Sequence, residues 1–305
     1  MLDQVNANKR RSALLLAAFV VAVAAVASVV NLVAGGGIAG LLAALVVAAA
    51  TALAAYWRSD AVALGLSHAR PADPTEHARL HNLVEGLCVA AGLPKPAVYV
   101  IEDDALNAFA TGRDPRHAAV AVTTGLLASM SRIELEGVLA HELSHVKSQD
   151  ILVSTLAVTT VGFVALASDW WLRSGWGGGP RHRPDRRGRG RARGAAAVLA
   201  APGFLLLPLA PLAARLMRLA VGRRRELVAD VMGVALTRYP PGLVSALEKL
   251  RSGPTVVRSA SPATAHLWIE SPVAQGGSEG KLAWLGRLFD SHPPIDQRIQ
   301  ALSEL

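Results

Sequence analysis

The sequence predicts an α+β protein that is mostly helical, with a small sheet and about four transmembrane helices. Hydrophobic residues make up 52% of the 305 residues, and the mean hydropathy is +0.35. The apolar residues gather in four runs of about 20 residues, the length that crosses the hydrocarbon core of a bilayer. The polar stretches between these runs show the periodicities of helices and short strands. We therefore expect a membrane anchor and a soluble part in one chain.

The first two apolar runs predict a membrane hairpin over residues 1–57. Ala13–Ala34 follows the basic residues Lys9–Arg11, a pattern that also begins secretory signal peptides. This run is too long for an ordinary signal core, and a second run, Ile38–Ala55, follows almost at once. Tyr56–Trp57 comes where interfacial aromatic residues belong. We expect two retained spans with the N-terminus in the cytosol.

Residues 58–150 are expected to form the first part of a soluble domain. Asp73 followed by Pro74 predicts a helix start, and that helix extends to about Ala91. Three stretches then have the character of strands, with a turn between the last two: Pro96–Glu102, Asn107–Gly112 and Ala118–Thr123.

A metal-binding pattern follows on the next predicted helix. Ser131 with Glu134 matches a capping box, and the helix that it begins carries the HExxH motif His141–His145. Residues four apart share a helical face, so both imidazoles can bind one ion while Glu142 is free to reach a bound water. The alternative is a helix with two histidines that bind nothing.

A catalytic zinc needs a third protein ligand, and Glu226 is the best candidate in the sequence. Asp230 lies four residues further along the same predicted helix and can orient a ligand histidine. The alternative is an exposed helix with ordinary Arg–Glu pairs. His77 and His81 also stand four apart, but no carboxylate accompanies them, and a solvated face is the better interpretation.

Two further apolar runs, Ile151–Leu172 and Ala195–Ala214, predict a second membrane hairpin over residues 151–214. Between them, residues 173–194 form an Arg- and Gly-rich loop, for which we expect disorder or binding of anionic lipid headgroups. If both runs cross the membrane, this loop lies outside, against the positive-inside tendency. Both runs can instead dip into the bilayer and return. Residues 215–305 then complete the soluble domain.

The charge is as uneven as the hydropathy. The net charge is +8, and the 173–194 loop supplies eight arginines and one aspartate, so the rest of the chain is close to neutral. No global basic patch for nucleic acid is indicated, and we expect no nucleic-acid partner. Cys88 is the single cysteine, which excludes an intrachain disulfide.

Three motifs in order, HELSH, RRRELVAD and SHPPIDQRI, resemble those of the HtpX-type membrane metalloproteases of the M48 peptidase family. The resemblance implies a gluzincin-like fold with one Zn²⁺ per subunit held by His141, His145 and Glu226. It implies Glu142 as the general base and His292 near the zinc, stabilising the oxyanion. It implies that Asp230 contacts a ligand side chain without binding the zinc itself.

The resemblance also implies where and on what the protein acts. Asn107, Ala108, Phe109 and Ala110 would belong to an edge strand that pairs with extended substrate backbone. Substrates would be membrane proteins or unfolded polypeptides, cleaved at the cytosolic face of the cell membrane in stress-linked quality control. Such a protein is a multi-pass enzyme whose catalytic domain faces the cytoplasm.

Three rival interpretations remain, two of them proteases and one a protein without enzyme activity. An intramembrane site-2-type protease would have HExxH inside a span, whereas polar residues flank the motif here. A CaaX-type prenyl-peptide protease would have more spans. A catalytically inactive membrane scaffold or lipid-binding protein would have no need of an intact Glu142.

Overall fold

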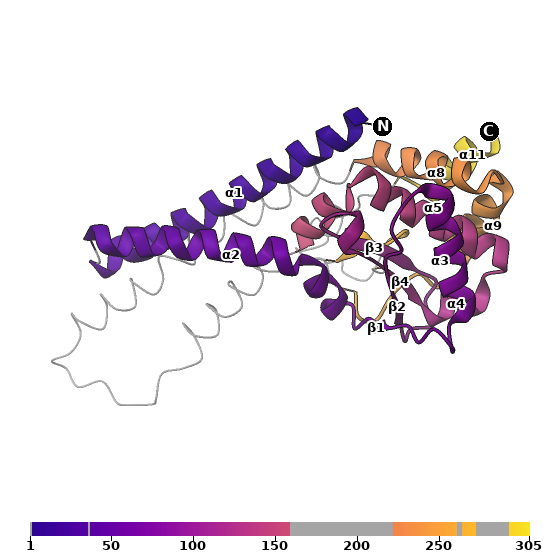
Figure 1. Ribbon diagram of the computed structural model, residues 1–305, viewed down its shortest axis with the longest axis horizontal. Helices are drawn as coiled ribbons and strands as arrows, with labels where there is room; N and C mark the ends of the chain where they lie inside the picture. The colour runs from indigo at the N-terminus through magenta and orange to yellow at the C-terminus, as the bar shows by residue number, and fades with distance from the viewer. Residues whose placement is uncertain (1, 36, 159–221, 261–263, 273–292) are drawn as a thin grey trace, which may run out of the picture.

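The computed structural model describes residues 2–35, 37–158, 222–260, 264–272 and 293–305. A long helical hairpin projects from a globular part in which helices surround a small sheet (Figure 1). The hairpin consists of α1 (Leu2–Ala34) and α2 (Gly37–Leu66), which lie side by side. These helices cover both predicted runs of the N-terminal hairpin.

Membrane spanning is supported for one helix of the described chain. The segment Gly37–Ala54 of α2 is long and apolar enough to cross a bilayer, and only 17% of it is buried in the structure. Residues 151–158 are helical and begin the third predicted run. The rest of that run, the Arg-rich loop and the fourth run lie outside the described residues. Four spans therefore remain a prediction.

The sheet has four strands in the order β1-β2-β4-β3, and β3 forms one edge. β2 and β4 are parallel, and the outer pairs are antiparallel. Three strands match the predicted ones within a residue or two, whereas the sequence interpretation did not include the two-residue β1. Their bounds are β1 (Arg70–Pro71), β2 (Ala97–Ile101), β3 (Ala108–Gly112) and β4 (Ala118–Thr123).

Both faces of the sheet are covered, which explains the uninterrupted small apolar residues of β4. One face contributes Val120 and Val122 to a core shared with α3 (Ala78–Ala91) and α5 (Arg132–Ser148). The other face packs against the C-terminal end of α2 and a segment around Trp268. The sheet thus lies between the helix that carries HExxH and the base of the hairpin.

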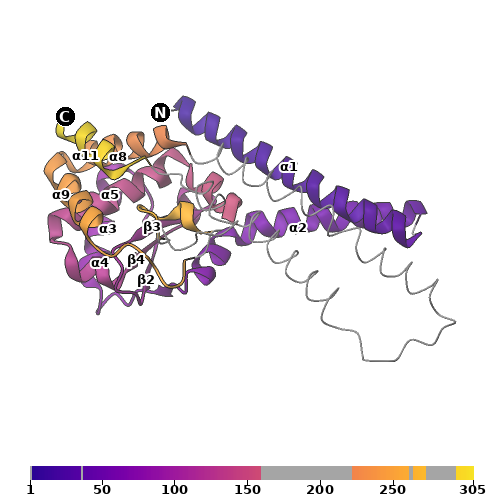
Figure 2. The same cartoon turned by 180° about the vertical axis from the view of Figure 1, so that it is seen from behind.

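The remaining elements complete the globular part (Figure 2). α8 begins at Arg223 and carries both Glu226 and Asp230, as the sequence predicted for a single helix. The short α4 and the amphipathic α9 were not predicted. The bounds are η1 (Pro115–His117), α4 (Thr124–Ser129), α8 (Arg223–Thr237), α9 (Pro240–Ser252), η2 (Ala265–Leu267) and α11 (Ile295–Ser303).

Two predicted boundaries were wrong. The helix expected from Asp73 begins at Ala78, because the Asp73 carboxylate accepts hydrogen bonds from the backbone of Thr75 and Glu76 and so closes a separate turn. The boundary predicted after residue 57 falls inside α2, which continues to Leu66. The last helix, α11, begins directly after Pro294.

Candidate metal centre

The predicted capping box fixes the start of the helix that carries the histidines. Ser131 Oγ accepts a hydrogen bond from the Glu134 backbone N–H, and Glu134 Oε2 accepts one from the Ser131 backbone N–H at 2.7 Å. The Glu134 carboxylate also accepts hydrogen bonds from Ser245 and Lys249 of α9. α5 is therefore anchored at its N-terminal end and held buried along most of its length.

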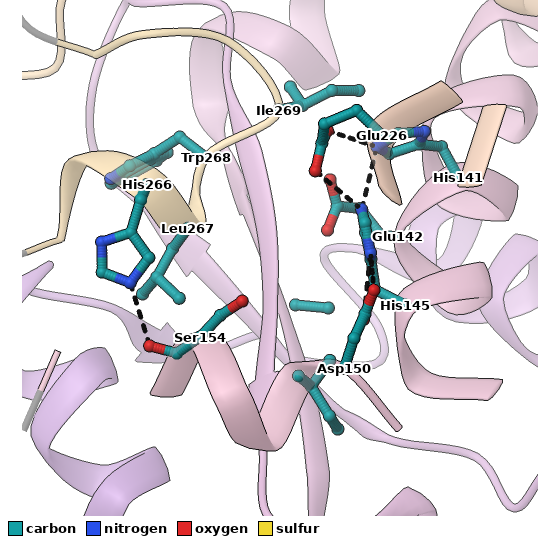
Figure 3. A pocket seen from close by; sticks show the side chains of 12 residues that line it. His141, Glu142, His145, Asp150, Ser154, Glu226, His266, Leu267, Trp268 and Ile269 are labelled. Carbon is teal, nitrogen blue, oxygen red and sulfur yellow. Dashed lines mark hydrogen bonds and ion pairs between the residues drawn. The ribbon is translucent and has the colours of Figure 1, made fainter. Parts of the chain in front are cut away.

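Three side chains from two helices converge on one point (Figure 3). The Nε2 atoms of His141 and His145 lie 3.2 Å apart. Glu226 on α8 brings one carboxylate oxygen 3.6 Å from His141 Nε2 and the other 3.7 Å from His145 Nε2. All the potential ligand atoms lie within 4.8 Å of one another.

These distances fit a metal ion. Ligands about 2.0–2.1 Å from a tetrahedral ion lie roughly 3.3–3.5 Å apart, close to the separations of the three side chains. In the described part of the chain no other group of His, Cys, Asp and Glu side chains has this arrangement. The set His, His and Glu, with one position left for water, is typical of catalytic rather than structural zinc.

Each histidine is supported on its other ring nitrogen by an aspartate, which fixes the ring orientation. His141 Nδ1 lies 2.8 Å from Asp230 Oδ1, where the sequence placed a carboxylate behind a ligand. His145 Nδ1 lies 3.0 Å from Asp150 Oδ2. The sequence interpretation did not include Asp150.

A fully buried arginine completes the support of His141. Arg298 on α11 donates from Nε and Nη2 to the two oxygens of Asp230, at 2.8 and 2.7 Å, and from Nη1 to the Ile269 carbonyl at 2.9 Å. Its charge and hydrogen bonds keep the pKa of Asp230 low although burial acts in the opposite direction. Arg298 lies within the motif SHPPIDQRI, but nothing in the sequence alone assigned it to this carboxylate.

Glu142 is fully buried beside the three ligands. Burial raises the pKa of Glu142, and the negative charge of the neighbouring Glu226 adds to this increase. The charges of His141 and His145 and a backbone hydrogen bond from Ala110 act in the opposite direction. A carboxylate with a raised pKa, held next to a metal site without being a ligand, is suited to accept and return a proton.

The cavity at this centre is small. It has a volume of about 20 Å³, enough for one water molecule, and Trp268 and His266 form its wall opposite the ligands (Figure 3). His266 is held there by a contact of 2.9 Å between its Nε2 and the Ser154 carbonyl. The sequence interpretation assigned neither side chain to the site.

The predicted substrate strand lies beside this cavity, and its edge is partly paired already. β3 is an edge strand, as expected, but Trp268 forms an antiparallel bridge with Phe109, and the Ile269 N–H donates to the Ala108 carbonyl at 2.9 Å. The Asn107 side chain donates to the carbonyl of Glu270 in the same segment and to the carbonyl of Thr255. Substrate pairing at Ala108 therefore requires movement of Trp268–Ile269.

The other candidate residues divide into two groups. His292, the predicted oxyanion residue, lies outside the described residues and stays a prediction. His77 and His81 do not form a metal group: His81 Nε2 instead lies 3.0 Å from the Ala72 carbonyl. This second pair serves the local structure at the start of α3.

A His–Glu–x–x–His helix completed by a glutamate from a second helix defines a metalloprotease of the HExxH class. The comparisons agree with this class. The model of peptidase family M48 matches residues 74–305. Three relatives are each described as a protease HtpX homolog. They come from Thermoanaerobacter pseudethanolicus (45% identity, covering 82% of this chain and 80% of the relative), Tropheryma whipplei (44%, 83% and 81%) and Streptococcus gordonii (39%, 83% and 82%).

The chain belongs to peptidase family M48. Its similarity to HtpX homologs confirms the resemblance that the three motifs indicated. The crystal structure of S. mikatae Ste24p is more distant, with 19% identity, a TM-score of 0.43, and coverage of 82% of this chain and 55% of that one. This last similarity is too low to support an argument about function.

Proposed function

We propose that this protein is a zinc-dependent endopeptidase of the membrane that hydrolyses peptide bonds of membrane or unfolded proteins. The observation that carries the proposal is the convergence of His141, His145 and Glu226 on one point, with the buried Glu142 beside them. The residues fit zinc in number, type and spacing. When bound, the ion would polarise the scissile carbonyl and lower the pKa of a water molecule to about 7.

The residues of the chain supply the proton transfers. Glu142 takes the proton of the attacking water, which its raised pKa favours, and then gives it to the leaving amine. Asp230 and Asp150 keep both imidazoles oriented toward the metal. An extended substrate would lie along β3 after displacement of Trp268–Ile269.

We place the reaction at the cytosolic membrane surface. The candidate span in α2 ends at Ala54, and three residues later the Trp57 ring contacts the Arg113 guanidinium, 4.6 Å from the ring centre. Arg113 follows β3 directly, so the predicted membrane interface and the substrate strand are neighbours. Binding of anionic lipid by the 173–194 loop stays part of this proposal.

The test compares the detergent-purified protein with its Glu142→Gln variant, using an unfolded polypeptide as substrate. Because the amide cannot accept the proton, cleavage should fall by roughly 10²- to 10⁴-fold while zinc content is unchanged. Purification with a chelator, followed by addition of zinc, limits self-digestion. Equal cleavage by both proteins would rule out Glu142 as the base. Zinc binding without cleavage by the unmodified protein would favour the inactive scaffold.

A further inference from the structure

The residues that hold the His145 ring in place, Asp150 and Arg225, lie on either side of the predicted second membrane hairpin in the sequence. Asp150 lies two residues beyond the end of α5, and Arg225 precedes the metal ligand Glu226 on α8. Between them in the sequence lie residues 151–224, which include the predicted second membrane hairpin of residues 151–214. Asp150 and Arg225 are therefore far apart in the sequence but in contact in the fold.

Their contact is buried and has several components. Arg225 Nε donates to Asp150 Oδ2 at 3.1 Å, and Nη2 donates to the Asp150 backbone carbonyl at 3.1 Å while lying 3.0 Å from Oδ2. The side chains of Asp150 and Arg225 are only 5% and 13% exposed. A buried carboxylate shared by an imidazole and a guanidinium is held in one orientation, because loss of either partner leaves a charge without compensation.

The backbone brings Asp150 to this position by a tight change of direction. α5 ends at Ser148, and the residue that caps it, Gln149, has a φ of 56° and so lies in the left-handed region. The next helix begins at once, and the Asp150 carbonyl accepts its first hydrogen bond from the Ser154 N–H. This turn directs the Asp150 carboxylate back to His145 instead of along the helix.

We infer that Asp150 and Arg225 are positioning residues that act as one unit, setting the metal-binding geometry of both His145 and Glu226. Asp150 orients the His145 ring from behind, and through Arg225 it fixes the first turn of α8, on which Glu226 is the next residue. The inference rests on the proposed zinc site. The inference adds that two of the three zinc ligands, His145 and Glu226, depend on the Asp150–Arg225 contact, which does not itself involve the metal.

The experiment measures zinc affinity instead of activity. The full chain carrying Glu142→Gln, which prevents self-digestion, is purified in detergent and titrated with zinc in competition with a chromophoric chelator. Added Asp150→Asn or Arg225→Met should each weaken zinc binding about 10- to 100-fold, the usual effect of removing a residue behind a metal ligand. The double variant should bind zinc no more weakly than Asp150→Asn alone, because that single change already disrupts the Asp150–Arg225 contact.

Glu134→Gln is the matched control. It also disrupts an ion pair of α5, the half-buried Glu134–Lys249 pair at 2.7 Å, but near the opposite end of the helix from the metal ligands. It should leave the zinc affinity within about twofold while lowering the thermal stability of the metal-free protein. An equal loss of affinity in Glu134→Gln and Asp150→Asn would overturn the inference, since it would show general destabilisation.

Arg225→Lys tests the positioning role even if the other variants do not fold. Lysine keeps the charge but cannot donate to Oδ2 and to the Asp150 carbonyl with one planar group, so zinc affinity should fall several-fold. An unchanged affinity in a folded Arg225→Lys or Asp150→Asn protein would contradict the positioning role. Failure of the parent itself to bind zinc would instead refute the proposed function.

Discussion

At His141, burial and charge have opposite effects on the same ring. Burial acts against protonation, but the charge of Asp230 and the hydrogen bonds to Asp230 and Glu226 outweigh it and raise the pKa of His141 to about 9. Before a metal binds, the ring is therefore protonated at neutral pH. A metal ligand has to be the neutral imidazole, so binding must release this proton.

Zinc affinity should therefore rise with pH. A histidine whose pKa is raised keeps its proton below that value, so competition between proton and zinc weakens binding as the pH falls from about 9 to 6. Calorimetric titration in two buffers of different ionisation enthalpy would measure the protons released. An affinity independent of pH over this range, without proton release, would show that His141 is already neutral.

Apart from the ligand Glu226, the sequence predicted the residues whose relation is local and missed those brought together by the fold. His141 and His145 follow from helical spacing, and Asp230 from its distance of four residues to Glu226. Asp150 reaches His145 only because Gln149 takes a left-handed conformation, which no residue type there indicates. Arg298 reaches Asp230 from a helix 68 residues further along the chain.

Among the elements, α5 and α8 have to approach closely for the ligands to meet. Gly233 of α8 faces the backbone of α5 at His141, and a Cβ atom there would lie 3.0 Å from the His141 nitrogen and 3.1 Å from its Cα. Helical periodicity predicted both elements but not this contact. The distance between two helices depends on small residues whose partners the sequence does not identify.

Gly233→Ala should consequently separate the two helices by a few tenths of an ångström. We expect a loss of about 1–3 kcal/mol in the free energy of unfolding, together with weaker zinc binding, because Glu226 moves with α8. Gly86→Ala on α3 is the control, since its Cβ would meet no atom within 4 Å. Denaturant unfolding and chelator competition measure the two effects. Equal behaviour of both variants would contradict a close approach at Gly233.

In the molecule as a whole, the anchor and the globular part share a core. Ala63 and Leu64 of α2 are buried against Ile101 and Phe109 of the sheet. Hydropathy predicted an anchor and a soluble part, but Ala63 and Leu64, which follow the predicted boundary, are in a helix of the anchor and in the core of the globular part. The hairpin is therefore packed into the domain that carries the metal site.

Two truncations test this shared core. A chain that begins at Tyr56 keeps the end of α2 and should bind zinc like the full chain. A chain that begins at Ser67 loses Ala63 and Leu64 and should be less stable by about 2 kcal/mol or more, from the apolar area exposed. Thermal unfolding of both chains in detergent with zinc gives the comparison. Identical melting temperatures would mean that α2 is only a tether.

The metal centre itself is the central claim, and X-ray absorption at the zinc edge tests it most directly. The full chain carrying Glu142→Gln is loaded with one equivalent of zinc in detergent. We expect two imidazole nitrogens and additional oxygen ligands at about 2.0–2.2 Å, with one imidazole lost in a further His145→Ala variant. A zinc–sulfur distance of about 2.3 Å, which would implicate Cys88, or a spectrum unchanged by His145→Ala, would contradict the site formed by His141, His145 and Glu226.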